Sequence, residues 1–281
     1  EINLLQNPKN VGFAKAHNQI IRQILFESDD FYLALNPDVQ LTDTYIQELV
    51  SGVCASKAGW GTGKLLQADS YEAEYNIIYS TGHALLSDGY IFNIGYGLPD
   101  KKQWDIAREI WGAPATALII TADLLQYLQD IDCVYEETFF LYNEDTDFDW
   151  KARNLGWTCS YIPTARAYHR GGSPTPKLKV LSIGNRYLSA IKNAPRWDLF
   201  SYILPVMCLH LLIRCLITPI SGIRLVSYVA RYAPRMVYKR RVIRPSRSVF
   251  SAWILNAITE ETSQPRTLGD RLSIFIQDLL D

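Results

Sequence analysis

The sequence predicts an α/β fold, in which a sheet is flanked by helices. Two kinds of pattern lead to this prediction. Short apolar runs rich in strand-forming residues end in turn signals, and longer segments repeat apolar residues at helical spacing. The chain has 281 residues, of which 48% are hydrophobic and 20% charged. This composition supports a large core in one domain with an appendage.

The first half of the chain alternates helical and strand patterns. Residues Val11 to Phe26 and Thr44 to Val53 are predicted to be helices, and the segment Phe31 to Val39 between them opens with an apolar strand. The strand ends in Asn36-Pro37-Asp38, so Asp38 should lie in a turn at its carboxyl end. Open α/β sheets bind ligands at this end of their strands. On its own, Asn-Pro-Asp is more often a purely structural turn.

Two glycine-containing segments follow. Gly61 to Leu65 superficially looks like a phosphate loop, but the glycine spacing is wrong and no Ser or Thr follows Lys64. It is predicted to be the start of a strand. Leu85 to Gly97 carries Asp88-Gly89 between alternating apolar residues, the pattern of a hairpin. His83 beside it is more often a structural residue than a ligand.

Carboxylates are densest directly after an aromatic run, within Phe139 to Trp157. They are Glu144, Asp145, Asp147 and Asp149. Clustered acids repel one another, so some must be protonated, solvated or matched to a cation. Asn143 is predicted to cap a helix that ends at Gly156. A reaction centre is one interpretation, and an ordinary acidic first turn of a helix is the other.

Asp38, the acidic cluster and His169 together indicate a metal and diphosphate site. Carboxylate and imidazole suit Mn²⁺, whereas Mg²⁺ prefers oxygen ligands. The alternative for His169 is a strand-end histidine bonded to the backbone.

Several motifs, taken in order, resemble the family-2 inverting glycosyltransferases, most closely the bacterial rhamnosyltransferase-like enzymes that build surface polysaccharides. The motifs are N-P-K-N-V-G-F-A-K-A-H-N (Asn7 to Asn18), L-N-P-D-V (Leu35 to Val39), W-G-A-P-A (Trp111 to Ala115), F-F-L-Y-N-E-D-T-D-F-D-W-K-A-R (Phe139 to Arg153), Pro163 and His169. The resemblance implies a GT-A-like mixed sheet flanked by helices, a nucleotide-sugar donor and a divalent metal, Mn or Mg.

The resemblance also implies roles for single residues. Asp145, in the pair with Glu144, would be the catalytic base that takes the proton of the acceptor hydroxyl. Asp38 and His169 would bind the metal, which neutralises the leaving diphosphate. The expected donor- and acceptor-binding residues are Asn18, Asn36, Trp111, Gly112, Ala113 and Asp147. Asn36 stands where the family's D-x-D motif has its first acid, so we expect modest metal affinity.

Compared with members of this family, the sequence starts part-way into the expected catalytic domain. Its first residues resemble the strand after the acidic turn that grips the nucleoside, so we expect residues 1–195 to be a catalytic domain lacking roughly forty to fifty N-terminal residues. The donor site would then be incomplete. The alternative is a catalytically inactive remnant that binds a membrane or a partner transferase. A nucleotidyltransferase fits the acidic helix and His169 less well.

Residues 196–281 have a different character. The net charge of −1 hides a segment from Leu199 to Thr259 with no Asp or Glu and nine basic residues. Its apolar start is interrupted by Pro205 and reaches Arg214 after fifteen residues, too short for a confident membrane span. We expect helices lying on an anionic membrane surface. The alternative is that these helices pack on the core with a solvated basic face.

The remaining composition narrows the class of protein. Five scattered cysteines without C-x-x-C spacing argue against a disulfide framework or a zinc site. The basic segment lacks a nucleic-acid-binding module, so nucleic acid is not an expected partner. With this composition, the resemblance implies a cytoplasmic enzyme, peripheral on the inner face of the cell membrane, which transfers a sugar such as rhamnose to a glycan or lipid-linked acceptor.

Overall fold

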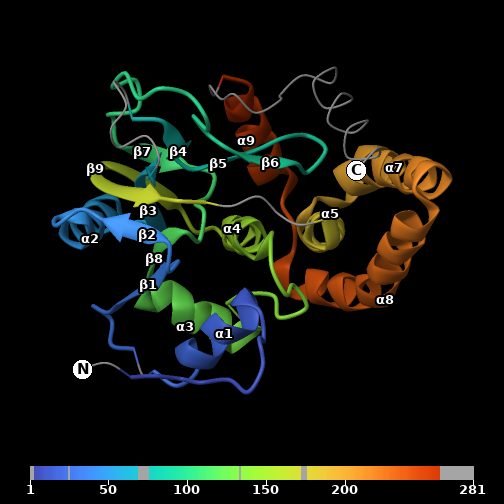
Figure 1. Ribbon diagram of the computed structural model, residues 1–281, viewed down its shortest axis with the longest axis horizontal. Coiled ribbons are helices and arrows are strands. Elements are labelled where there is room, and N and C mark those ends of the chain that lie inside the picture. The colour runs from blue at the N-terminus through green and yellow to red at the C-terminus, as the bar shows by residue number, and fades with distance from the viewer. Residues whose placement is uncertain (1–2, 25, 69–75, 133, 172–175, 260–281) are drawn as a thin grey trace.

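The computed structural model describes residues 3–24, 26–68, 76–132, 134–171 and 176–259 (Figure 1). At its centre lies a seven-stranded sheet with the order β1-β8-β3-β9-β2, to which β4 and β7 add through β3 and β9. The strands are β1 (Phe31–Leu35), β2 (Val39–Leu41), β3 (Trp60–Gln67), β4 (Ile78–Ser80), β7 (Arg108–Ile110), β8 (Ala117–Thr121) and β9 (Cys159–His169). Only β3 and β9 are parallel among the pairs described, so the sheet is mixed.

Helices cover both faces of this sheet, and β8 shows the division. Leu118 and Ile120 point into a core shared with α1 (Phe13–Ile21), α3 (Ala122–Ile131) and α4 (Glu144–Asn154). Ala117 and Ile119 point to the other face, where α2 (Tyr45–Ser56) packs. Alternation along a strand with both faces buried explains why β8 is apolar at almost every position.

The predicted elements are present, with shifted ends. The Leu85-to-Gly97 hairpin is confirmed as β5 (His83–Leu85) and β6 (Ile91–Asn93), with Gly89 at φ 78° in the connection. The segment Gly61 to Leu65 is confirmed as part of β3. β1 stops at Leu35, and the predicted Asn36-Pro37 turn follows before β2 begins.

The predicted helix over Val11 to Phe26 is too long, since α1 covers only Phe13–Ile21. Gly12 precedes it at φ 82°, and a Cβ atom there would lie 2.2 Å from the carbonyl oxygen of Phe140. The Phe13 N–H donates to that same oxygen at 3.0 Å. A tertiary contact to a distant loop therefore fixes where α1 starts.

The C-terminal region is helical over the residues described. Its elements are α6 (Arg196–Asp198), the π-helical turn η2 (Leu199–Ile203), α7 (Leu204–Ile217), α8 (Pro219–Ile243) and α9 (Arg247–Thr259). The first three form one helix over Arg196–Ile217, which by length and composition alone could cross a membrane, with a mean hydropathy of 1.9 in its most apolar stretch. Arg214 does not interrupt it, because this side chain is buried and donates to Ser221 of α8.

α5 (Pro176–Asn193) connects the sheet to these helices, and α7 and α8 lie beyond it (Figure 1). Gly184 lets α8 approach closely, since a Cβ atom there would lie 2.6 Å from the ring of Tyr228. α9, the last helix of the described chain, covers part of the core, where Phe250 stacks on Trp150 with ring centroids 5.7 Å apart.

Some of the basic C-terminal residues pair with the core. Lys239 of α8 binds Asp132 and Glu136, at 2.7 Å in both cases. Arg235 lies 3.4 Å from Glu136. Part of the basic charge of the C-terminal region is therefore used to pack these helices on the core, as the alternative prediction has it. The basic residues of α8 and its C-terminal end that are exposed are Arg224, Arg231, Arg235, Arg241 and Arg244.

Candidate active site

The two predicted metal residues lie together at one end of the sheet. Asp38 lies in the turn between β1 and β2, and His169 is the last residue of β9. Val39 pairs with His169 across the two strands, which places the neighbouring Asp38 beside the imidazole. The distance from His169 Nε2 to Asp38 Oδ2 is 3.3 Å. The Asp38 side chain is 42% exposed and that of His169 only 6%, so the carboxylate faces outward from a buried histidine.

This pair has the donor types that a divalent metal uses. Burial lowers the pKa of His169, and the charge of Asp38 opposes that shift only in part. A neutral imidazole is the form that binds a metal. One carboxylate and one imidazole fit Mn²⁺, with its other positions left to water and phosphate oxygens. The described residues contain no group of three or more His, Cys, Asp or Glu that could hold a metal.

Tyr79 of β4 lies between the metal pair and the acidic helix. Its ring meets His169 edge-on, with centroids 4.4 Å apart, and its hydroxyl bonds to Thr116. Burial raises the pKa of Tyr79 to about 12, and the charges of Asp145 and Asp38 add to this shift. The tyrosine is thus within electrostatic reach of both carboxylates. Sequence patterns did not single it out, because it is one aromatic residue in an ordinary alternating run.

Asp145 lies in the first turn of α4, where backbone amides hold its carboxylate. It accepts from the N–H of Thr146 at 2.8 Å and of Ala115 at 3.3 Å. The neighbouring Thr116 accepts from the N–H of Asn36 at 3.0 Å. A single short segment before β8 therefore links the Asp38 turn to Asp145. Asn36 itself is half-buried in that turn.

The start of α4 has an unusual backbone. Tyr142 and Asn143 have φ values of 70° and 63°, the left-handed region that non-glycine residues rarely adopt. Asn143 is the N-cap residue of α4, as predicted, but its side chain makes no cap hydrogen bond, and its amide donates to the Ser182 carbonyl at 2.9 Å. Asn185 donates to the Tyr142 carbonyl at 2.8 Å. Two residues of α5 therefore hold the strained loop that positions the acidic turn.

Glu144 is buried beside Asp145. Burial, followed by the charge of Asp145, raises the pKa of Glu144 to about 8. In the part of the chain that the structure describes, Glu144 Oε2 is buried without a hydrogen-bond partner. Glu144 therefore keeps its proton near neutral pH, and the acidic pair carries less negative charge than two ionised carboxylates would.

Asp149 is the centre of a buried polar cluster. It accepts from Trp60 Nε1 at 2.9 Å and from the Ala113 N–H at 3.1 Å, and it lies 2.7 Å from His83 Nδ1. Burial raises its pKa to about 6 against the effect of His83. Gly112 is required beside it, since a Cβ atom there would lie 2.1 Å from the carboxyl carbon. Gly112 and Ala113 thus hold Asp149 inside the protein, in addition to any place at a ligand site.

Asp147, a predicted binding residue, faces the opposite side of α4. Its carboxylate is fully buried, pairs with Lys192 Nζ, and accepts from Asn193 Nδ2 at 2.8 Å. Lys192 and Lys239 also surround Glu136, and their charges lower the pKa of Glu136 despite its burial. These groups form an ionic network that joins α4, α5 and α8. Asp147 is therefore part of this internal network, and its carboxylate is not open to a ligand.

Two more predicted binding residues have their side chains inside the protein. Asn18 of α1 exchanges hydrogen bonds with the backbone of Tyr135, at 2.8 and 3.0 Å. Trp111 is buried between Trp150 and Trp253, with ring centroids 6.2 Å away in each case. In this arrangement the Trp111 ring is not available for sugar stacking and the Asn18 amide is not open to a ligand, because neighbouring residues cover both side chains.

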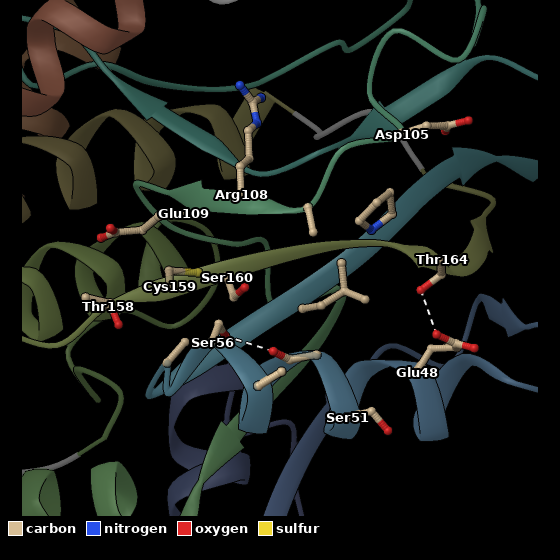
Figure 2. Close-up of a pocket in the computed structure, with 16 residues that line it drawn as sticks. Glu48, Ser51, Ser56, Asp105, Arg108, Glu109, Thr158, Cys159, Ser160 and Thr164 are labelled. Atoms are coloured by element: carbon tan, nitrogen blue, oxygen red, sulfur yellow. Dashed lines mark hydrogen bonds between the residues drawn. The ribbon is translucent and has the colours of Figure 1, made fainter.

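A pocket of about 760 Å³ lies away from these residues, against α2, β7 and the first half of β9 (Figure 2). Thr164 donates to Glu48 across its edge at 2.7 Å, and Asp105, Arg108 and Glu109 contribute charges. Asp38 and His169 instead lie where the parallel strands β3 and β9 end, the edge at which α/β sheets bind ligands. We therefore place the candidate active site at that edge.

Comparisons with known proteins bear on the fold. No protein-family model and no curated protein matches this sequence. Among solved structures, the chain is similar to the crystal structure of GalNAc-T7 with UDP, GalNAc and Mn²⁺, with a TM-score of 0.57 and 12% sequence identity. The match covers 92% of this chain and 46% of that one, so the chain spans about half the length of its structural relative. At this identity the likeness shows the fold alone, and it confirms the prediction that the chain has a GT-A-like fold, with a mixed sheet flanked by helices.

Proposed function

We propose that this protein is a metal-dependent inverting glycosyltransferase that uses a nucleotide-sugar donor. The observation that carries the proposal is the placement of Asp38, His169 and Asp145 around Tyr79 at the carboxyl edge of β3 and β9. The similarity in fold to a protein crystallised with UDP, GalNAc and Mn²⁺ supports the same classes of ligand here.

Asp38 and His169 are the residues that would hold the cation. A bound Mn²⁺ or Mg²⁺ neutralises the negative charge that develops on a leaving diphosphate. Asp38 is suited to this role because its carboxylate is partly exposed, and His169 because burial favours its neutral form. Asn36 adds no charge at this turn, which is consistent with modest metal affinity.

Asp145 is the proposed base. Two backbone amides hold its carboxylate in place without neutralising it, so it can accept the proton of an acceptor hydroxyl. One in-line attack from that side displaces the diphosphate and inverts the sugar carbon. Glu144 is proposed as its catalytic neighbour, since the proton on Glu144 avoids a second negative charge beside the base.

The finer assignments rest on the sequence resemblance. They are rhamnose as the sugar, a glycan or lipid-linked acceptor in polysaccharide synthesis, and a cytoplasmic enzyme peripheral on the inner face of the membrane. The exposed apolar side chains of the Arg196–Ile217 helix and of α8 support the membrane assignment.

Donor binding with and without Mn²⁺ tests the proposal. Calorimetric titration with a panel of nucleotide-sugars should detect at least one that binds more tightly with the metal. Asp38→Ala should reduce the metal-dependent affinity by about tenfold or more, because a metal ligand is lost. The exposed Asp43→Ala is the matched control and should leave it unchanged. If Mn²⁺ leaves the donor affinity unchanged, the proposed metal dependence is contradicted. Failure to bind any donor would favour the non-catalytic alternative.

A further inference from the structure

We infer that a second pocket, at the corner between α7 and α8, binds the phosphate of an anionic phospholipid headgroup. This inference rests on the membrane association proposed above and concerns a part of the molecule remote from the sugar-transfer site. The pocket has a volume of about 860 Å³ and is built from α5, α7 and α8. Its polar lining residues are Lys179, Arg214, Thr218, Ser221, Arg224 and Tyr228.

The charge of the pocket indicates an anion. Three of these residues are basic, and no Asp or Glu is among the described residues that line it. Arg214 is only 4% exposed, and its guanidinium Nε and Nη2 donate to Ser221 Oγ at 3.2 and 3.1 Å. A buried guanidinium presents a planar set of donors that matches the geometry of phosphate oxygens. Arg224 is exposed, one turn along α8 from Ser221, so it lies on the same face of the helix.

The first turn of α8 forms part of the same wall. Thr218, Pro219, Ile220 and Ser221 all line the pocket. The Thr218 side chain does not cap the helix, because its hydroxyl donates to the Arg214 carbonyl at 3.2 Å. The first-turn amides of this long helix therefore add their partial positive charge to that of the three basic side chains.

An apolar rim shows why the anion belongs to a lipid. Beside the pocket, large apolar side chains point outward, and Leu216 is 73% exposed. The others on the rim are Ile217, Ile220 and Ile223, and the exposed row continues along the Arg196–Ile217 helix through Leu212 and Leu209. Contiguous exposed apolar side chains mark a surface that is covered by another apolar phase. A headgroup phosphate in the pocket would place acyl chains against this rim, as for a helix that lies in a membrane interface.

The position in the fold agrees with this assignment. α7 and α8 lie on the side of α5 away from the sheet (Figure 1). Gly222 brings the two helices together at the corner, since a Cβ atom there would lie 2.6 Å from the Cys215 Cα atom. The pocket is therefore a fixed feature of the α7–α8 junction, and it can dock on a membrane while the carboxyl edge of the sheet stays open.

Co-sedimentation with vesicles tests the inference. The full chain would be mixed with vesicles of phosphatidylcholine alone, or with about one quarter phosphatidylglycerol. The parent should prefer the anionic vesicles. Arg224→Glu should lose about tenfold or more of that affinity. Arg241→Glu makes the same charge change at an exposed position of the same helix outside the pocket, and should lose less than about threefold. Arg224→Lys keeps the charge without the planar fork and should lie between them.

Four other outcomes would contradict the inference. Equal losses in Arg224→Glu and Arg241→Glu would show diffuse attraction without a pocket. Equal binding to both kinds of vesicle would leave membrane association in place but remove the headgroup site. Displacement of the protein from anionic vesicles by millimolar inorganic phosphate, with a rise in melting temperature in phosphate alone, would assign the pocket to a soluble ligand. Absence of binding to any vesicle would overturn the membrane assignment too, while donor titrations test sugar transfer separately.

Discussion

The carboxylates on the two faces of α4 have different surroundings. On one face, Asp147 is enclosed by Lys192 and Asn193 and joins the ionic network between α4, α5 and α8. On the other, Asp145 accepts from two backbone amides at an edge that it shares with Asp38 and His169. Both residues are in the first turn of the same helix and are two positions apart in the sequence.

The difference shows how an enclosed acid and an acid at the candidate site are separated. Successive residues on a helix point in different directions, whereas residues four apart share a face. Asp145 and Asp149 therefore both meet the segment before β8, at Ala115 and Ala113. Asp149 is buried there and bonds to the side chains of Trp60 and His83, while the two hydrogen bonds given above for Asp145 come from the backbone. Asp147 is thus fully enclosed by the fold, whereas Asp145 stays half-buried at the candidate site.

Asp145→Asn should give the largest effect on activity. Loss of the base should reduce transfer by roughly 10²- to 10⁴-fold while leaving donor affinity and melting temperature almost unchanged. Turnover and donor binding would be measured on the same preparation. The matched control is Asp123→Asn, which makes the same change in the first turn of α3. Turnover within twofold of the parent would show that Asp145 is not the base.

Asp147→Ala should instead destabilise the fold, by about 3–5 kcal/mol, because it leaves Lys192 buried beside an empty position. The measurement is the free energy of unfolding in urea. The double variant Asp147→Ala/Lys192→Met removes both charges and should recover part of the loss. A cost below about 1 kcal/mol would mean that the pair is not a structural anchor, and the binding role first predicted for Asp147 would become the better assignment.

Glu144 should give the fold a pH dependence. Its pKa rises from 4.5 to about 8 on folding, so the folded state binds the proton more tightly across that interval. The resulting stability is fully present below pH 4.5 and is lost as the pH rises toward 8, with a slope of at most about 1.4 kcal/mol per pH unit. Glu144→Gln should flatten this slope, and the exposed Glu27→Gln should not. A parent and a Glu144→Gln variant with parallel pH profiles would contradict a buried, protonated Glu144.

Sequence patterns predicted well those parts of the fold that depend on residues close together in the sequence. The hairpin around Gly89, the turn at Asn36-Pro37 and the end of α4 at Gly156 all follow from residues close in sequence. Asp38 and His169 do lie together, because strand-end motifs meet at one edge of a sheet, while their metal-binding role stays a prediction.

What the sequence could not reveal depends on contacts between distant segments. Asn143 is the N-cap residue of α4, but its side chain bonds to Ser182 of α5, and Asn185 of α5 bonds to the carbonyl of the preceding Tyr142. The basic residues of α8 looked solvent-exposed or membrane-facing, but Lys239 pairs with Glu136 more than a hundred residues away. Side chains such as these gain partners only once the helices pack, so no spacing rule identifies them.

Tyr79→Phe should have the smallest effect and is the sharpest test of how the two halves of the site communicate. The substitution keeps the ring that packs on His169 and removes only the hydroxyl that bonds to Thr116. We expect a loss of about 0.5–1.5 kcal/mol in unfolding free energy and about a tenfold or smaller fall in turnover, with metal-dependent donor binding retained. Tyr79→Ala should lower both turnover and metal-dependent binding, since it also removes the contact with His169. If Tyr79→Phe weakens metal-dependent binding as much as Tyr79→Ala does, the hydroxyl itself acts at the metal turn, and Asp38 and Asp145 are coupled more directly than their shared segment before β8 indicates.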